Sequence, residues 1–170
     1  MKRFLIVLAV LLISMFGCNL ANAQHMKKGM NQFNAGLGVA PGVGVNASYD
    51  YGLVNDWGPG IFTIGGYVGF GTWGRTYRGL SHPANYRTTA FAFAPRATYR
   101  YAIDPLFEIC GTAMLGAVVY SYSDYVHNET RPFFAITGGI RYLFSTNVSL
   151  FAEVGFNEIS FLNVGLSFSF

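Results

Sequence analysis

The chain has 170 residues, of which 52% are hydrophobic, 17% are aromatic and only 11% are charged. This composition excludes a disordered chain, and it also leaves too few charges to cover a soluble domain, where about a quarter of the residues are charged. The formal net charge is +3, but two of the basic residues are Lys2 and Arg3, at the very start of the chain. The rest of the chain is almost neutral, which gives no reason to expect nucleic-acid binding.

Residues 1–23 have the pattern of a secretory signal peptide. Two basic residues precede an apolar stretch over residues 4–16, and the sequence ANA at 21–23 fits a cleavage site, so we predict that the exported chain begins at Gln24. A membrane anchor helix is one alternative, although spanning a bilayer takes about 20 apolar residues. Lipoprotein processing at Cys18 is a second alternative, which the sequence leaves open.

Residues 24–30 are predicted to form an exposed periplasmic N-terminal tail, and the alternation that follows continues to the end of the chain. Apolar residues alternate there with small or polar ones, and a period of two is typical of β-strands. Gly, Pro, Asn, Asp or polar runs bound the strands. Eight segments are predicted, at about 32–39, 43–51, 62–70, 91–101, 107–119, 134–144, 148–156 and 162–170.

Two connections between these segments are long and polar, and we predict that both are loops. They cover about residues 74–87 and 121–132, whereas the connections at 103–105 and 145–147 are short. If the first strand starts in the periplasm, both long loops lie outside the cell, as in outer-membrane barrels. The first and last connections are short although external, so loop length suggests this orientation without deciding it.

The two faces of each segment differ in the same way throughout. One face is aliphatic or aromatic, and the other is small or polar. A soluble lipocalin-like or jelly-roll domain would bury the apolar face and charge the other. If the apolar face meets lipid instead, closure into a barrel pairs every backbone group. We therefore predict an all-β fold over residues 31–170: a closed, eight-stranded, antiparallel up-and-down transmembrane β-barrel.

An eight-stranded barrel has an interior just wide enough to be filled by side chains. Small residues must therefore lie beside large inward ones such as Tyr67, Met114 and Phe151. Aromatic residues near strand ends are expected in girdles at the two membrane interfaces. These are Tyr49, Tyr51, Trp57, Trp73, Tyr99, Tyr101, Tyr120 and Tyr142.

Charged residues inside strands fall on the inward face. Folding the fourth strand onto the fifth places Arg100 within reach of Glu108, and folding the sixth onto the seventh places Arg141 diagonal to Glu153. Buried charges are costly unless they are paired. We predict a network of Arg96, Arg100, Glu108, Arg141 and Glu153 that plugs the lumen, with a gated ion path as the alternative; Asp50 is a further inward charge.

The chain ends in NVGLSFSF, in which Asn163, Gly165, Phe168 and Phe170 have the spacing polar, any, Gly, any, any, aromatic, any, aromatic. This spacing resembles the C-terminal assembly signal of Gram-negative outer-membrane barrels. The chain from about residue 31 onward is similar to the small eight-stranded, porin-family barrels of the OmpA transmembrane-domain and OmpX kind. The resemblance implies recognition by the barrel assembly machinery and periplasmic chaperones, contact with outer-membrane lipids and lipopolysaccharide, and pairing of the last strand with the first.

Enzymatic alternatives find little support in the sequence. A deacylase acting on lipid A would need a His-Ser pair with a supporting carboxylate, but His82 and His127 lie in the predicted loops and His25 in the tail. Cys110 is the only cysteine outside the leader, so neither a disulfide nor a zinc site is expected. We expect a structural or adhesive protein without catalytic activity or cofactor. A narrow channel for small solutes is the second candidate, and a lipid A-modifying enzyme is the third.

Overall fold

The computed structural model describes residues 24–54, 58–78, 83–122 and 125–170, with side chains described at all of these except 75–78, 83–86 and 125–127. The predicted signal peptide, Cys18, Trp57 and His82 lie outside the described residues. Among the residues that are described, no helix is long and apolar enough to cross a membrane.

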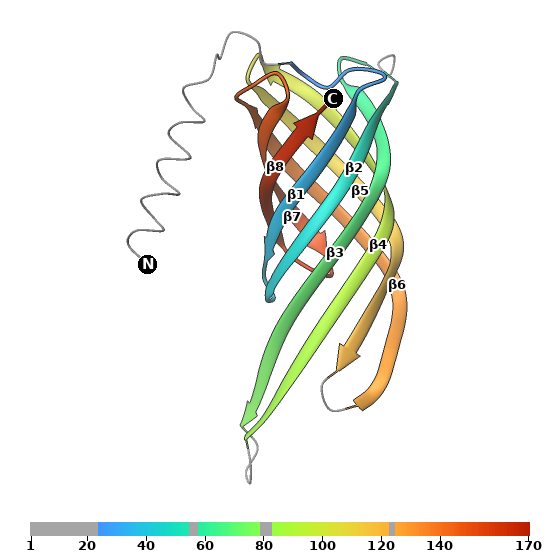
Figure 1. Ribbon diagram of the computed structural model, residues 1–170, viewed down its shortest axis with the longest axis vertical. Helices are drawn as coiled ribbons and strands as arrows, with labels where there is room; N and C mark the ends of the chain where they lie inside the picture. The colour runs from blue at the N-terminus through green and yellow to red at the C-terminus, as the bar shows by residue number, and fades with distance from the viewer. Residues whose placement is uncertain (1–23, 55–57, 79–82, 123–124) are drawn as a thin grey trace, which may run out of the picture.

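Eight antiparallel strands form one closed barrel, in which each strand pairs with its neighbours in the chain and β8 pairs with β1 (Figure 1). This arrangement confirms the predicted fold. The strands are β1 (Asn31–Val39), β2 (Val43–Val54), β3 (Ile61–Arg78), β4 (Pro83–Asp104), β5 (Phe107–Tyr122), β6 (Tyr125–Leu143), β7 (Val148–Asn157) and β8 (Leu162–Ser169).

The apolar face of the strands points outward. Phe91 is 47% exposed and Ile136 is 54% exposed, whereas the adjacent Ala92 and Thr137 are buried. The soluble alternative, in which the apolar face forms the core, is therefore wrong. Because exposing so much apolar surface to water is unfavourable, and a closed barrel leaves no backbone group unpaired at an edge, the outer surface is suited to hydrocarbon.

Closure of the barrel brings the first strand next to the last. Asn31 and Phe170 exchange two backbone hydrogen bonds, of 3.0 and 2.9 Å. Next to them, Gln32 pairs with Ser169 and the register continues along both strands. The predicted pairing of the last strand with the first is confirmed.

Four strands are much longer than the others. β3, β4, β5 and β6 have 18, 22, 16 and 19 residues, and they extend beyond the turn between β1 and β2 (Figure 1). Beyond Thr72, β3 pairs only with β4, and before Ala135, β6 pairs only with β5. We call this four-stranded extension, residues 73–78, 83–90, 118–122 and 125–134, the projecting sheet.

The projecting sheet corrects the prediction of two long loops at 74–87 and 121–132. Both segments are mostly strand, because β3 continues to Arg78 and β4 begins at Pro83, while β5 and β6 leave only residues 123–124 between them. Polarity was the reason for predicting loops. Polar residues are also expected on strands that leave the membrane, and the Thr and Tyr residues of these segments favour the extended backbone.

The interior has two parts. Toward the chain termini it is polar, and toward the projecting sheet it is filled by an apolar cluster in which the rings of Tyr67 and Phe133 stack with centroids 5.9 Å apart. Trp73 and Tyr122 pack against this cluster. The buried members of the apolar cluster are Tyr67, Ala90, Ala92, Ala94, Met114, Val118, Tyr120, Phe133, Ala135 and Ile159.

Two aromatic residues were assigned wrongly to the membrane girdles. Tyr120 is only 9% exposed, and its ring meets Trp73 edge-on at 6.2 Å, so both point into the interior. Tyr49, Tyr51 and Tyr101 are exposed on the outer face, as a girdle requires.

Large inward side chains do lie beside small residues, as predicted. Phe151 is 3% exposed, and a Cβ added to Gly36 or Gly165 would lie 2.8 Å from its ring. Gly165 of the C-terminal pattern therefore has a packing role, because a Cβ there would clash with the carbonyl oxygen of Ala35 on β1 as well as lying 2.8 Å from the Phe151 ring.

Candidate functional site: a buried charge network

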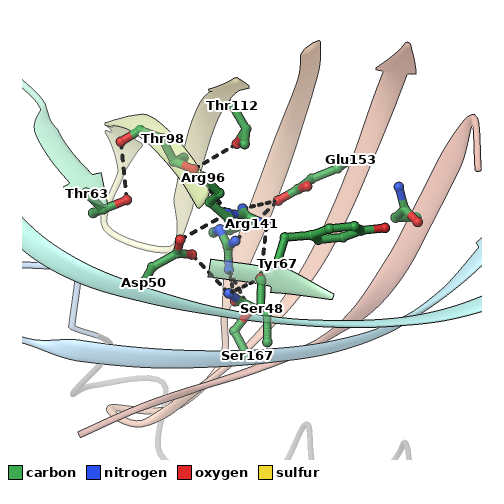
Figure 2. Close-up of polar contacts among 12 residues, drawn as sticks. Ser48, Asp50, Thr63, Tyr67, Arg96, Thr98, Thr112, Arg141, Glu153 and Ser167 are labelled. Atoms are coloured by element: carbon green, nitrogen blue, oxygen red, sulfur yellow. Dashed lines mark hydrogen bonds and ion pairs between the residues drawn. The ribbon is translucent and has the colours of Figure 1, made fainter. Parts of the chain in front are cut away.

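Five charged side chains from β2, β4, β6 and β7 meet inside the polar part of the barrel, and four of them are labelled in Figure 2. Each is at most 4% exposed. They reach the interior because each occupies an inward position of its strand. The five are Asp50, Arg96, Arg100, Arg141 and Glu153.

Arg96 links the two carboxylates of this network. Its Nε lies 3.0 Å from Oδ1 of Asp50, and its Nη2 lies 3.0 Å from Oε1 of Glu153. The same oxygen of Glu153 is 3.4 Å from Nη2 of Arg141. Of the residues expected in the network, Arg96, Arg141 and Glu153 are thus in direct contact, and Arg100 joins them through Asp50.

Arg100 makes a different contact from the one expected. Its Nη2 lies 2.7 Å from Oδ2 of Asp50, and its Nη1 donates to Gln32, so the expected Arg100–Glu108 ion pair is wrong. Glu108 is diagonal to Arg100 in the ladder, beside an irregularity between Ala102 and Asp104. Asp50 prevails as the partner because it is fully buried, at 0% exposed, and needs compensating cations.

Uncharged polar side chains complete the network. Asn34 donates to Asp50 at 3.0 Å, while its own Oδ1 accepts from Arg141 at 2.9 Å. Arg96 donates to Ser48 at 3.0 Å. These partners matter because a buried charge costs less when its hydrogen-bonding groups are satisfied. The satisfaction is incomplete, since Oδ1 of Asp50 and the Nε atoms of Arg100 and Arg141 have no hydrogen-bond partner among the residues that the structure describes.

Asp50 and the uncharged partners were not included in the predicted network, although their inward positions were visible in the alternation. The prediction considered only contacts between neighbouring strands. Asp50 on β2 reaches Arg96 on β4 across β3, where the inward residue between them is Gly65. Arg100, which is opposite Ile61 on β3, reaches Asp50 diagonally.

Charge balance links the network to a third carboxylate. The three arginines exceed Asp50 and Glu153 by one positive charge. Glu108 is 3% exposed and lies opposite Arg141 in the β5–β6 ladder, and it contacts His25 and the backbone of Met26. Of the five predicted residues, Glu108 therefore stands apart, at the end of the barrel where β1 begins and β8 ends.

The projecting sheet carries a second group of polar contacts. Arg131 donates to both oxygens of Glu129 at 2.8 Å, and these hydrogen bonds raise the pKa of its guanidinium. The same guanidinium lies 5.6 Å from the centre of the Tyr120 ring, whose hydroxyl donates to Glu158 at 2.7 Å. Aromatic and charged groups thus share one face of the sheet.

The described residues contain no group of three or more His, Cys, Asp and Glu that could hold a metal ion. His82 lies outside them, as does the side chain of His127. A hollow of about 670 Å³ on the outer face is lined by apolar side chains such as Pro95, Ala97 and Leu115. Its polar lining residues are Tyr49, Tyr51 and Arg96, and, among the described residues, the lining does not contain the histidine, serine and carboxylate of a hydrolase triad.

Comparison with solved structures supports the fold. A de novo designed transmembrane β-barrel aligns with 86% of this chain and all of its own, with a TM-score of 0.55 and 17% identity. The N-terminal β-barrel domain of Pseudomonas aeruginosa OprF gives the same score and identity over 85% of this chain and all of its own. The Yersinia pestis outer membrane protein Ail in a phospholipid nanodisc aligns at 0.50, with 16% identity over 84% of this chain and all of its own.

Neither the models of known protein families nor the sequences of curated proteins match this chain significantly. At these identities the likeness concerns the fold alone. The chain has the fold of the small eight-stranded outer-membrane β-barrels.

Proposed function

We propose that the protein is an integral barrel of a Gram-negative outer membrane that presents the projecting sheet to the outside and binds surface ligands through it. The observation that carries this proposal is the length of β3–β6, which extend past the membrane-facing belt and hold aromatic and charged side chains on one face. A barrel needed only as a membrane anchor has no use for such an extension.

The inner face of the projecting sheet is suited to recognition. Trp73 and Tyr122 remain partly exposed beside the buried Tyr120, and Arg131 and Glu129 have side chains 55% and 41% exposed. Rigid aromatic rings next to charged groups bind ligands with little loss of conformational entropy. The two outer strands of the sheet also have one unpaired edge each, which can accept a strand from a partner.

Transport is the second candidate, and the filled interior argues against it. Every charged group of the network contacts a partner, and the interior beyond the network is filled by the apolar cluster, which continues onto the inner face of the projecting sheet. An eight-stranded barrel filled in this way has no continuous water column. Planar-bilayer recording separates the candidates, since steady unit currents that Arg100→Ala abolishes would favour the channel.

An outer-membrane location requires export across the inner membrane and assembly of the barrel. We propose export by the predicted signal peptide and recognition of Asn163, Gly165, Phe168 and Phe170 by the assembly machinery. Phe168 is 41% exposed and Phe170 is 67% exposed, so both side chains are accessible on the outer face of β8. Lipid A mass profiles with and without the gene test the third candidate, an enzyme, and unchanged profiles are expected.

The binding proposal is tested with cells that display the chain. Their retention on panels of immobilised extracellular proteins and glycans is compared for the unaltered chain, Trp73→Ala and Tyr122→Ala. Loss of retention in both variants is expected. Phe107→Ala is the matched control, because this aromatic residue is 43% exposed on the outer face near the chain termini. Retention that is the same in all four strains contradicts the proposal.

A further inference from the structure

Residues 24–30 are predicted to be an exposed tail. Instead they lie across the mouth of the barrel, at the end where β1 begins and β8 ends (Figure 1). Gly29 donates to the carbonyl of Gly52 at 2.8 Å, and Gly52 donates to the carbonyl of Met30 at 2.9 Å. Met26 is only 6% exposed. The segment is therefore fixed to the end of β2 and turns an apolar side chain inward.

Glu108 holds the other side of this segment. Its Oε1 is 2.9 Å from Nδ1 of His25 and accepts a hydrogen bond of 3.2 Å from the backbone N–H of Met26. Arg100, the cation expected to pair with it, is bonded to Asp50 and Gln32 instead. A buried carboxylate without hydrogen-bond donors is costly, so residues 24–30 supply the donors that Glu108 requires.

A cavity of about 250 Å³ lies between this segment and the barrel wall. His25 and Met26 line it on one side, and Arg100 and Glu108 line it on the other. Arg100 also belongs to the buried charge network. The segment is thus the boundary between the network and the space beyond the mouth, while the apolar cluster closes the opposite end of the interior.

We propose that residues 24–30 are a displaceable plug, latched onto Glu108, that controls access to the charge network from the end of the barrel where the termini lie. This inference goes beyond the proposed function, which depends on the projecting sheet at the other end. The plug is held by the hydrogen bonds of Gly29 and Met30 to Gly52 and by the contacts of His25 and Met26 with Glu108. These contacts lie outside the β1–β2 pairs, which begin at Asn31 and Tyr51.

Cys110 is a natural reporter of plug opening. Its side chain is 7% exposed and points inward on β5, opposite Arg100 and one inward position deeper than Glu108. The only other cysteine in the sequence is Cys18, in the predicted leader. The plug lies over the mouth on the side of Glu108, so its displacement should make this thiol easier to reach for a reagent that enters there.

The experiment measures the rate at which N-ethylmaleimide alkylates Cys110 in the folded, leader-free chain. Slow alkylation is expected for the unaltered chain, and rates about tenfold higher for His25→Ala and Met26→Ser, which corresponds to about 1.4 kcal/mol in favour of the open state. His25→Gln keeps a side-chain donor and should return the rate toward that of the unaltered chain. Lys28→Ala is the matched control, because this exposed residue of the same segment should leave the rate unchanged.

Equal alkylation rates in the unaltered chain, His25→Ala and Met26→Ser would overturn the proposal, as would an unaltered chain that reacts as fast as in urea. Gel migration before and after boiling verifies that each variant is folded. If a variant does not fold, hydrogen exchange of the unaltered chain tests whether residues 24–30 are held at the mouth. The amides of Gly29 and Gly52 should be protected, and exchange at the rate of an unstructured peptide would contradict a plug.

Discussion

The two parts of the interior are built from the same inward positions but are stabilised by opposite chemistry. Toward the termini, Asp50, Arg96 and Arg100 are held by ion pairs and hydrogen bonds. Toward the projecting sheet, Tyr67 and Phe133 stack within an apolar cluster. In the polar part each side chain depends on a few specific partners, whereas in the apolar part stability comes from many weak contacts.

This difference has a consequence for function. The strands around the polar part can move apart only if the buried ion pairs separate, so the network holds these strands in one arrangement. The apolar part continues onto the projecting sheet, where Trp73 and Tyr122 leave the core and become accessible. The charge network and the proposed ligand-binding surface thus lie at opposite ends of the same barrel.

The largest effect is expected from Asp50→Asn. This change leaves Arg96 and Arg100 without their shared carboxylate in a buried site, so the free energy of unfolding should fall by about 3 to 5 kcal/mol. Urea titration of the chain folded in detergent micelles, followed by gel migration, measures the loss. An unchanged midpoint would mean that water reaches these arginines and that the polar part is not a closed network.

A smaller loss is expected in the apolar part from Ile159→Ala. This side chain is 3% exposed, and its removal should lower the free energy of unfolding by about 2 to 3 kcal/mol through a cavity in the cluster. Phe161→Ala is the matched control from the same turn, since Phe161 is 57% exposed. If both variants unfold at the same urea concentration, Ile159 does not belong to the cluster.

Phe170→Ala should affect assembly more than stability. The side chain is 67% exposed on the outer face, so the purified barrel should unfold almost normally, while the assembled fraction in cells should fall. Gel migration of membrane fractions before and after boiling measures that fraction. Phe156→Ala, an outward aromatic on β7 that is 60% exposed, is the control. Equal assembled fractions in the two variants would count against a C-terminal recognition signal.

The smallest effect on stability is expected from Glu129→Ala. This carboxylate pairs with Arg131 on the exposed part of the projecting sheet, where water screens the ion pair. The urea midpoint should not change resolvably. A loss as large as that of Asp50→Asn would mean that the projecting sheet contributes to the fold as strongly as the buried network does.

Much of the fold could be predicted from the sequence, because the period-two pattern specifies both strands and faces. The outward position of Ile136 and the inward position of Arg96 follow from it directly. The projecting sheet could not be predicted, since polar residues such as those near Arg78 are equally common in loops. Contacts across the lumen, such as Asp50 with Arg100, depend on barrel curvature, which pairwise strand reasoning does not include.

The location of residues 24–30 could not be predicted from the sequence either. Lys27 and Lys28 make the segment look like a solvated tail, and both are indeed exposed. Met26, which precedes these lysines, turns inward because its backbone N–H donates to the buried carboxylate of Glu108, more than 80 positions later in the chain. Only the closed barrel brings these residues together.

The central claim is that the apolar face of the strands meets hydrocarbon. It is tested by tryptophan fluorescence in bilayers whose acyl chains carry bromine, which quenches on contact. Ile136→Trp in a chain also carrying Trp57→Phe and Trp73→Phe should be strongly quenched, whereas Trp73 as the single tryptophan, on the inner face of the projecting sheet and beyond the membrane-facing belt, should not be. Quenching of Trp73 together with an unquenched tryptophan at position 136 would contradict this account.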